Sequence, residues 1–282
     1  MTRLLIVNAD DYGLTTGVCR AIVRAHREGI VTSTSALALG PAFASCSTML
    51  NDVSDLGVGV HLAVVGEDPP LLSRSEIPSL VDRDGRLPLS WRRFLPRACT
   101  GRIAVDDLRR ELNAQLDVVS DALPGRTLTH LDTHQHLHLW PPFGSLVIEL
   151  ARERGIPAVR VTRSVGHGGR SLVVNQLGRR FAAKASAAGL RTTDVFAGFD
   201  EGGMLVTDAL ERTIDRVAAT NAHSAEIGVH PGEDGDADLA RYEWGYRWAE
   251  ELDALMSAEA RDAVERNGFT LGSYSALSAG RS

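Results

Sequence analysis

Near its start the chain reads LLIVNADDYG (residues 4–13), an apolar run that ends in two adjacent carboxylates. An unbroken aliphatic run of this length predicts a buried strand over residues 4–8. A helical pattern follows over residues 17–28, where apolar residues recur at helical spacing before Gly29. A buried strand followed directly by an amphipathic helix is typical of parallel α/β folds.

The same alternation continues along the chain. Further strands are expected at residues 32–39, 58–62, 128–132, 158–162, 194–196 and 226–230, and helices at residues 41–50, 105–122, 143–154 and 208–220. Because parallel strands need long crossovers, this order indicates a mainly parallel sheet, either doubly wound or closed as a barrel.

Two segments interrupt this alternation. Residues 67–100 are rich in Pro, Arg and Ser, and residues 164–203 are rich in Gly and Arg. We expect both to be insertions, serving as substrate loops or as solvent-facing decoration, on one domain that spans residues 1–282.

Composition excludes several classes of protein. The 282 residues carry 30 basic and 36 acidic side chains, a net charge of -6, which gives no electrostatic reason to expect a nucleic-acid partner. Cys19, Cys46 and Cys99 show no CxxC spacing, which argues against a disulfide framework or a thiolate zinc site. No apolar run is long enough for a signal peptide or a membrane span, so we expect a soluble cytoplasmic protein.

Polar residues stand at the ends of three expected strands. Asp10 and Asp11 follow the first strand, and a helix cap would explain one of these carboxylates but not both. His61 ends the strand at residues 58–62, and His230 ends the strand at residues 226–230. Each histidine alone could be a satisfied core residue, but their convergence at strand ends indicates a functional site.

The densest group is HLDTHQHLH (residues 130–138), which holds four of the nine histidines. Histidine and aspartate together are the usual ligands of a divalent metal. One carboxylate and two imidazoles leave positions open for water and a carbonyl oxygen, while a free carboxylate can act as base and an imidazolium as acid. No GxSxG, GxGxxG or Walker motif supports a covalent hydrolase or a nucleotide site.

Taken together, residues 8–13, 59–62, 130–138 and 230–232 resemble the motifs of the YdjC-like carbohydrate deacetylases. Residues 29–35, 191–194 and 242–246 are most similar to the HpnK branch, which is named for hopanoid biosynthesis. The resemblance implies an irregular (β/α) TIM-like barrel, compatible with a homodimer. It also implies metal-dependent removal of an acetyl group from an N-acetylglucosamine unit on a lipid-like or oligosaccharide aglycone.

The resemblance assigns roles to six residues, and four more are expected at the same site. The implied metal ligands are Asp11, His61 and His134, the implied catalytic residues are Asp10 (base), His230 (acid) and Arg160 (orienting the base), and the residues expected at the substrate are Tyr12, Asp132, His136 and His138. His138 is the alternative ligand to His134. One divalent ion is expected, Mg²⁺ by the resemblance or Zn²⁺ by the ligand type.

Two other functions fit the same residue types. A metal-dependent phosphoesterase or amidohydrolase would also place His and Asp at strand ends, with two metals in most cases. An inactive sugar-binding homologue would be expected to lack a base or a ligand, whereas every motif residue is present here.

Overall fold

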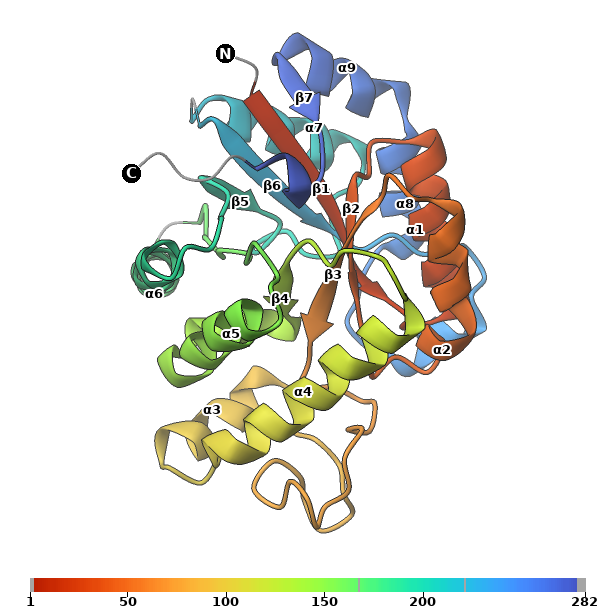
Figure 1. The fold of residues 1–282 in the computed structure, drawn as a ribbon. Helices are drawn as coiled ribbons and strands as arrows, with labels where there is room; N and C mark the ends of the chain where they lie inside the picture. Colours follow the sequence, from red (N-terminus) through yellow and green to blue (C-terminus); the bar gives the residue numbers. More distant parts are fainter. Residues whose placement is uncertain (1–2, 167, 221, 278–282) are drawn as a thin grey trace.

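The computed structural model describes residues 3–166, 168–220 and 222–277. Within them a parallel sheet runs in the order β4-β3-β2-β1-β6-β5, with β7 paired to β1 (Figure 1). The strands are β1 (Arg3–Tyr12), β2 (Ser33–Ala36), β3 (Gly57–Leu62), β4 (Leu131–Thr133), β5 (Val195–Ala197), β6 (Ser224–Val229) and β7 (Phe269–Leu271).

Helices cover the sheet, with α1, α2 and α8 on one side and α5 and α6 on the other (Figure 1). The helices are α1 (Thr16–Glu28), α2 (Phe43–Cys46), α3 (Trp91–Cys99), α4 (Val105–Ala122), α5 (Pro141–Glu153), α6 (Gly169–Ala187), α7 (Thr207–Ala218), α8 (Trp248–Met256) and α9 (Ala258–Arg266), with 3₁₀ turns η1 (Ser47–Asp52), η2 (His134–Leu139), η3 (Ala237–Arg241) and η4 (Tyr274–Ala276). No helix in the described ranges combines the length and the apolar character that a membrane span needs.

The long strand β1 lies at the centre of the sheet. One edge pairs with β6 over Leu4–Ala9, and the other edge pairs first with β7 and then, from Asn8 onward, with β2. Because these strands are parallel, their carboxyl ends, and therefore the polar residues that follow them, meet at the same end of the molecule.

The expected α/β class with parallel strands is confirmed, but the sheet does not form a full TIM barrel. The strand expected at residues 158–162 is reduced to two isolated bridges, Leu131 to Val159 and Ala158 to Arg191. Pro157, directly before them, has no N–H to extend the ladder. The result is a curved half-barrel that the residue 158–162 segment continues only irregularly.

A second difference concerns the helix expected at residues 41–50. It is a single turn, α2, followed by the 3₁₀ turn η1. The hydroxyls of Ser45 and Ser47 donate to the carbonyls of Ala42 and Ala44, a local bonding pattern that competes with regular helix.

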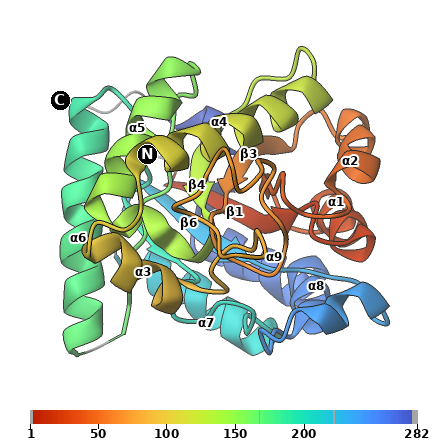
Figure 2. The same cartoon turned by 90° about the horizontal axis from the view of Figure 1, so that it is seen from below.

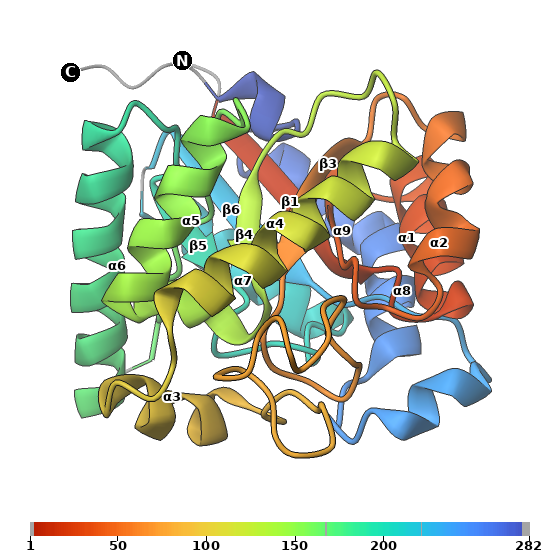
Figure 3. The ribbon, with the colours of Figure 1, turned by 60° about the horizontal axis from the view of Figure 1, so that its bottom comes forward.

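The two segments expected as insertions differ in character. Residues 67–100 form loops and α3, and they lie across the carboxyl ends of the strands (Figures 2 and 3). Asp68 anchors this segment by accepting hydrogen bonds from Arg241 (2.8 Å) and from the Tyr242 hydroxyl (2.9 Å). Residues 164–203 include the regular elements α6 and β5.

Candidate functional site

The backbone turns sharply where β1 ends. Asp11 has a φ of 63°, in the left-handed region, and the β1–β2 register shifts between Ala9 and Tyr12. A non-glycine residue in this conformation is uncommon and is typical of functional sites. The bulge directs the carboxylates of Asp10 and Asp11 to different partners.

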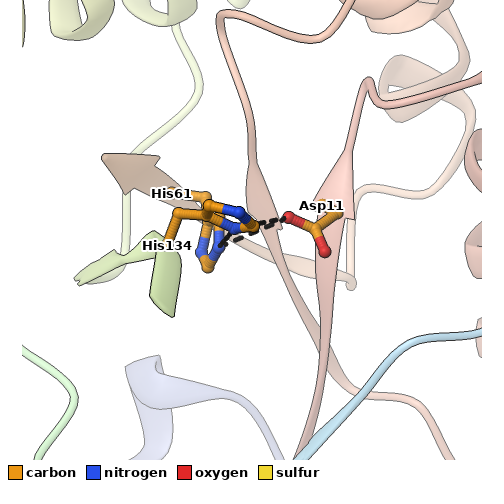
Figure 4. Close-up of side chains that lie close together, drawn as sticks. All are labelled: Asp11, His61 and His134. Carbon is orange, nitrogen blue, oxygen red and sulfur yellow. Dashed lines mark hydrogen bonds and ion pairs between the residues drawn. The ribbon is translucent and has the colours of Figure 1, made fainter. Parts of the chain in front are cut away.

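Asp11 meets His61 of β3 and His134, which directly follows β4 (Figure 4). The Asp11 Oδ1 atom lies 3.4 Å from His61 Nε2 and 3.4 Å from His134 Nδ1, and those two nitrogens are 3.3 Å apart. Three atoms that bind one ion at about 2.1 Å lie roughly 3.0–3.4 Å from one another. The three residues expected as ligands therefore form a triangle of the size that one divalent ion requires.

The donor set also fits a cation. Asp11 Oδ1 is buried and has no hydrogen-bond partner among the described residues, a costly arrangement unless a cation compensates it. Burial alone would raise the pKa of Asp11, but His134 and His61 outweigh this effect and hold the pKa below its usual range. The carboxylate is thus in the ionised form that a metal needs.

His61 is oriented from behind by Asp132, whose Oδ1 lies 2.8 Å from Nδ1 and leaves Nε2 facing the triangle. Burial opposes a charge on the ring, yet the Asp132 carboxylate raises the pKa of His61 to about 9. A carboxylate behind a metal-binding histidine is a common supporting arrangement. At neutral pH an ion entering the triangle must displace a proton from His61.

Arg160 is fully buried and holds three carboxylates. Its Nη1 and Nη2 each lie 2.7 Å from an oxygen of Asp10, Nη1 also lies 2.7 Å from Asp132, and Nε donates to Glu226 at 2.7 Å. Two parallel hydrogen bonds fix the plane of the Asp10 carboxylate. The residue expected to orient the base is therefore in contact with it.

This arrangement bears on the two-metal alternative. Asp10, His61 and Asp132 form a second group with metal-binding geometry. Both of its carboxylates are bonded to Arg160, so a guanidinium already supplies the positive charge there. The described residues thus favour one ion, at Asp11, His61 and His134.

His230 completes the site at the end of β6. Its Nε2 lies 3.9 Å from Asp10 Oδ2, and its backbone N–H donates to the buried Glu251 carboxylate at 2.6 Å. One bound molecule can therefore contact both the expected base and the expected acid.

The structure adds supporting residues that sequence reasoning missed. Burial raises the pKa of Glu226 to about 7, and the Tyr274 hydroxyl donates to it. Ser35 donates to Asp132 at 2.8 Å and lies 3.0 Å from His130, whose ring stacks on Tyr274. Glu226 belongs to a strand that was expected, but its apolar neighbours give no signal of a buried ion pair with Arg160.

Three of the four residues expected at the substrate are buried and bonded to other protein groups. Tyr12 donates to the Cys46 carbonyl at 2.7 Å, and Asp132 stands behind His61. His138 uses both ring nitrogens on the hydroxyls of Thr133 and Thr162, so neither is free for a metal. His136 is partly exposed and lies 5.1 Å from the Phe199 ring, which leaves it as the expected substrate contact that still borders open space.

His138 makes stability depend on pH. Burial, and then Arg160, lowers its pKa to about 3, whereas the unfolded imidazole titrates near about 6.5. Between these values only the unfolded state binds the proton, so acid favours unfolding by about 1.4 kcal/mol per pH unit. From pH 7 to pH 5, wild type should lose about 2 kcal/mol more unfolding free energy than His138→Gln in urea denaturation. An exposed His223→Gln control should follow wild type, and an equal loss in all three proteins would contradict the prediction.

The chain resembles known proteins over nearly its whole length. A family model described as "YdjC-like protein" matches residues 4–266. A chitooligosaccharide deacetylase of Klebsiella pneumoniae is 34% identical over 274 residues, which cover 97% of this chain and 99% of that protein. A chitooligosaccharide deacetylase of Salmonella paratyphi B is 33% identical over the same shares.

Among solved structures, a putative cellobiose-phosphate cleavage protein from Enterococcus faecalis superposes with a TM-score of 0.80 at 27% identity. The match covers 98% of each chain. The fold described above is therefore shared by a crystal structure along almost the entire chain.

Proposed function

This chain belongs to the YdjC-like protein family, and on that premise we propose that it hydrolyses the acetamide of an N-acetylglucosamine-type sugar to acetate and a free amine. The observation that carries the proposal is the joint placement of the Asp11, His61 and His134 triangle with Asp10 and His230. Two chitooligosaccharide deacetylases, each aligned over 97% of this chain, support the choice of an acetylated sugar.

We assign the divalent ion to Asp11, His61 and His134. When bound there, such an ion polarises a carbonyl and lowers the pKa of water. Two imidazoles favour zinc or a similar ion, whereas family resemblance favours magnesium, so both ions belong in the test.

Two side chains of the protein would each carry out one of the two proton transfers of the hydrolysis. Asp10, held by Arg160, takes the proton of the attacking water, and His230 gives a proton to the leaving nitrogen as the C–N bond breaks. Glu251 holds the backbone of His230, and Asp132 holds the ring of His61, so acid and ligand are both positioned from behind.

Acetate release tests the proposal directly. Metal-stripped protein, reloaded separately with Zn²⁺ and Mg²⁺, should release acetate from diacetylchitobiose or an alkyl N-acetylglucosaminide with at least one ion. The metal-stripped protein should be inactive. Release of phosphate from sugar phosphates, with no acetate from either substrate, would favour the phosphoesterase alternative.

We further propose that the aglycone is apolar, as expected for the HpnK branch. Leu172, Val173 and Met204 are exposed by 72%, 58% and 48%. The start of α6, which carries Leu172 and Val173, lies close to Phe199 because Arg170 packs over that ring at 5.3 Å. Phe199 in turn borders His136, so the start of α6 lies near the site.

Substrate preference provides the measurement. Burying 100 Å² of an alkyl chain gives about 2.5 kcal/mol before ordering costs, so kcat/KM should be at least about tenfold higher for a long-alkyl or hopanoid N-acetylglucosaminide than for diacetylchitobiose. The double variant Leu172→Ser, Val173→Ser should lose this preference without losing activity on diacetylchitobiose. A clear preference of wild type for the chitooligosaccharide would refute the apolar aglycone and leave the deacetylase proposal intact.

Homodimer formation and a cytoplasmic location stay predictions.

A further inference from the structure

Four aromatic residues at alternate positions form a continuous row beside the site: Tyr242, Trp244, Tyr246 and Trp248. Neighbouring rings in this aromatic row have centroids 5.1–5.5 Å apart. Trp244 lies 5.3 Å from the His134 ring, and Tyr246 lies 4.8 Å from the His230 ring. The row therefore connects the ligand triangle to the expected acid.

The polar atoms of the row are used differently. The Tyr242 hydroxyl donates to Asp68 at 2.9 Å, and Trp244 Nε1 donates to Glu67 at 3.0 Å, so both fasten the segment that covers the strand ends. The Tyr246 hydroxyl has no hydrogen-bond partner among the described residues, and Tyr246 is half-buried. A donor held in such a place without a protein partner is available to a ligand.

Two glycines define the position of Tyr246. A Cβ at Gly203 would lie 2.1 Å from its ring, so the absence of a side chain there lets the ring pack against the backbone. A Cβ at Gly202 would lie 3.6 Å from the Tyr246 hydroxyl and 3.8 Å from His230 Cε1. The hydroxyl and the imidazole therefore border the same small space.

The surroundings of the hydroxyl keep it a donor. Burial, followed by the Asp11 carboxylate, raises the pKa of Tyr246 well above its ordinary value. The charges that act on it belong to Asp11, Asp10 and Glu251, all of which lie at the site or directly behind His230. The hydroxyl is thus a neutral donor near the reacting groups.

Resting on the proposed deacetylase function, we propose that Tyr246 is a catalytic residue whose hydroxyl donates a hydrogen bond to the acetamide carbonyl oxygen. That oxygen gains negative charge when water adds to the carbonyl carbon and loses it when the C–N bond breaks. A fixed donor aimed at a developing oxyanion accelerates the reaction more than it tightens substrate binding.

The variant Tyr246→Phe tests this role, because it removes only an oxygen that has no partner among the described residues and keeps the ring on Gly203. For acetate release from a metal-loaded enzyme, kcat should fall about 10²–10³-fold, while KM changes less than about threefold. Metal content per chain and Tm should match wild type. The control Tyr242→Phe loses a hydroxyl that bonds to Asp68, and should lower Tm slightly while keeping kcat within about threefold.

The outcomes separate this inference from its premise. If wild type releases acetate and Tyr246→Phe retains its kcat, or raises only KM, the catalytic role is overturned and the deacetylase proposal stands. If metal-loaded wild type releases no acetate from any N-acetylglucosaminide, the proposed function fails and this role fails with it.

Discussion

Asp10→Asn is expected to lower kcat for acetate release by about 10²–10⁴-fold while leaving one metal ion per chain. The amide nearly preserves the shape of the carboxylate but cannot accept the proton of water. Metal content should persist because Asp10 is bonded to Arg160 and Asn8, whereas the ligand triangle uses Asp11.

The measurement is kcat alongside metal analysis of the same preparation. Asp117→Asn provides a matched control, since this carboxylate is exposed, lies outside the ligand triangle and pairs with Arg154. The control should keep wild-type kcat. If Asp10→Asn retained near-wild-type activity, the base would have to be another group.

Substitution of a metal ligand should have the second large effect, a loss of bound metal and of acetate release. His61→Ala or His134→Ala leaves two of three protein ligands, so the purified variants should hold far less than one ion per chain and show no measurable acetate release. Asp132→Asn removes the carboxylate behind His61, which also bonds Arg160 and Ser35. A 10–100-fold loss in metal affinity or activity, about 1.4–2.7 kcal/mol, is typical for such a supporting group.

Metal analysis after dialysis against a metal buffer gives the readout. His223→Ala, an exposed histidine outside the site, should bind metal as wild type does. His138→Ala should also retain the ion, because both ring nitrogens of His138 face threonine hydroxyls. Near-stoichiometric metal in His61→Ala or His134→Ala would show that the ion lies elsewhere.

Regular elements with strong local patterns could be predicted closely. The helices expected at residues 17–28 and 105–122 are α1 (Thr16–Glu28) and α4 (Val105–Ala122), and the strand expected at residues 58–62 is β3 (Gly57–Leu62). Each of these elements buries one face or the whole strand, so its apolar residues recur at a regular spacing. That spacing can be read from the element's own sequence, without knowledge of the rest of the fold. The segment at residues 158–162 also carries alternate apolar residues, but its pairing depends on neighbours that periodicity does not encode.

The candidate site divides in the same way. The sequence alone determined which residue types stand at the ends of parallel strands, and therefore that Asp10, Asp11, His61 and His230 share one end of the sheet. Only the tertiary structure decided which partner each of these side chains contacts. The left-handed turn at Asp11 sends one carboxylate to the histidines and leaves the other to Arg160, 150 positions away.

The tertiary structure also decided which polar residues are supports and which face open space. His134, His136 and His138 look alike in the sequence, but the left-handed residues Gln135 and His136 turn the backbone between them and give each ring a different partner. Glu226 and Tyr246 gave no local signal of their positions beside Arg160 and His230. The physical reason is that hydrophobic burial, which the sequence pattern records, fixes where strands and helices form, whereas hydrogen bonds and ion pairs between distant segments are fixed only once the sheet sets their distances.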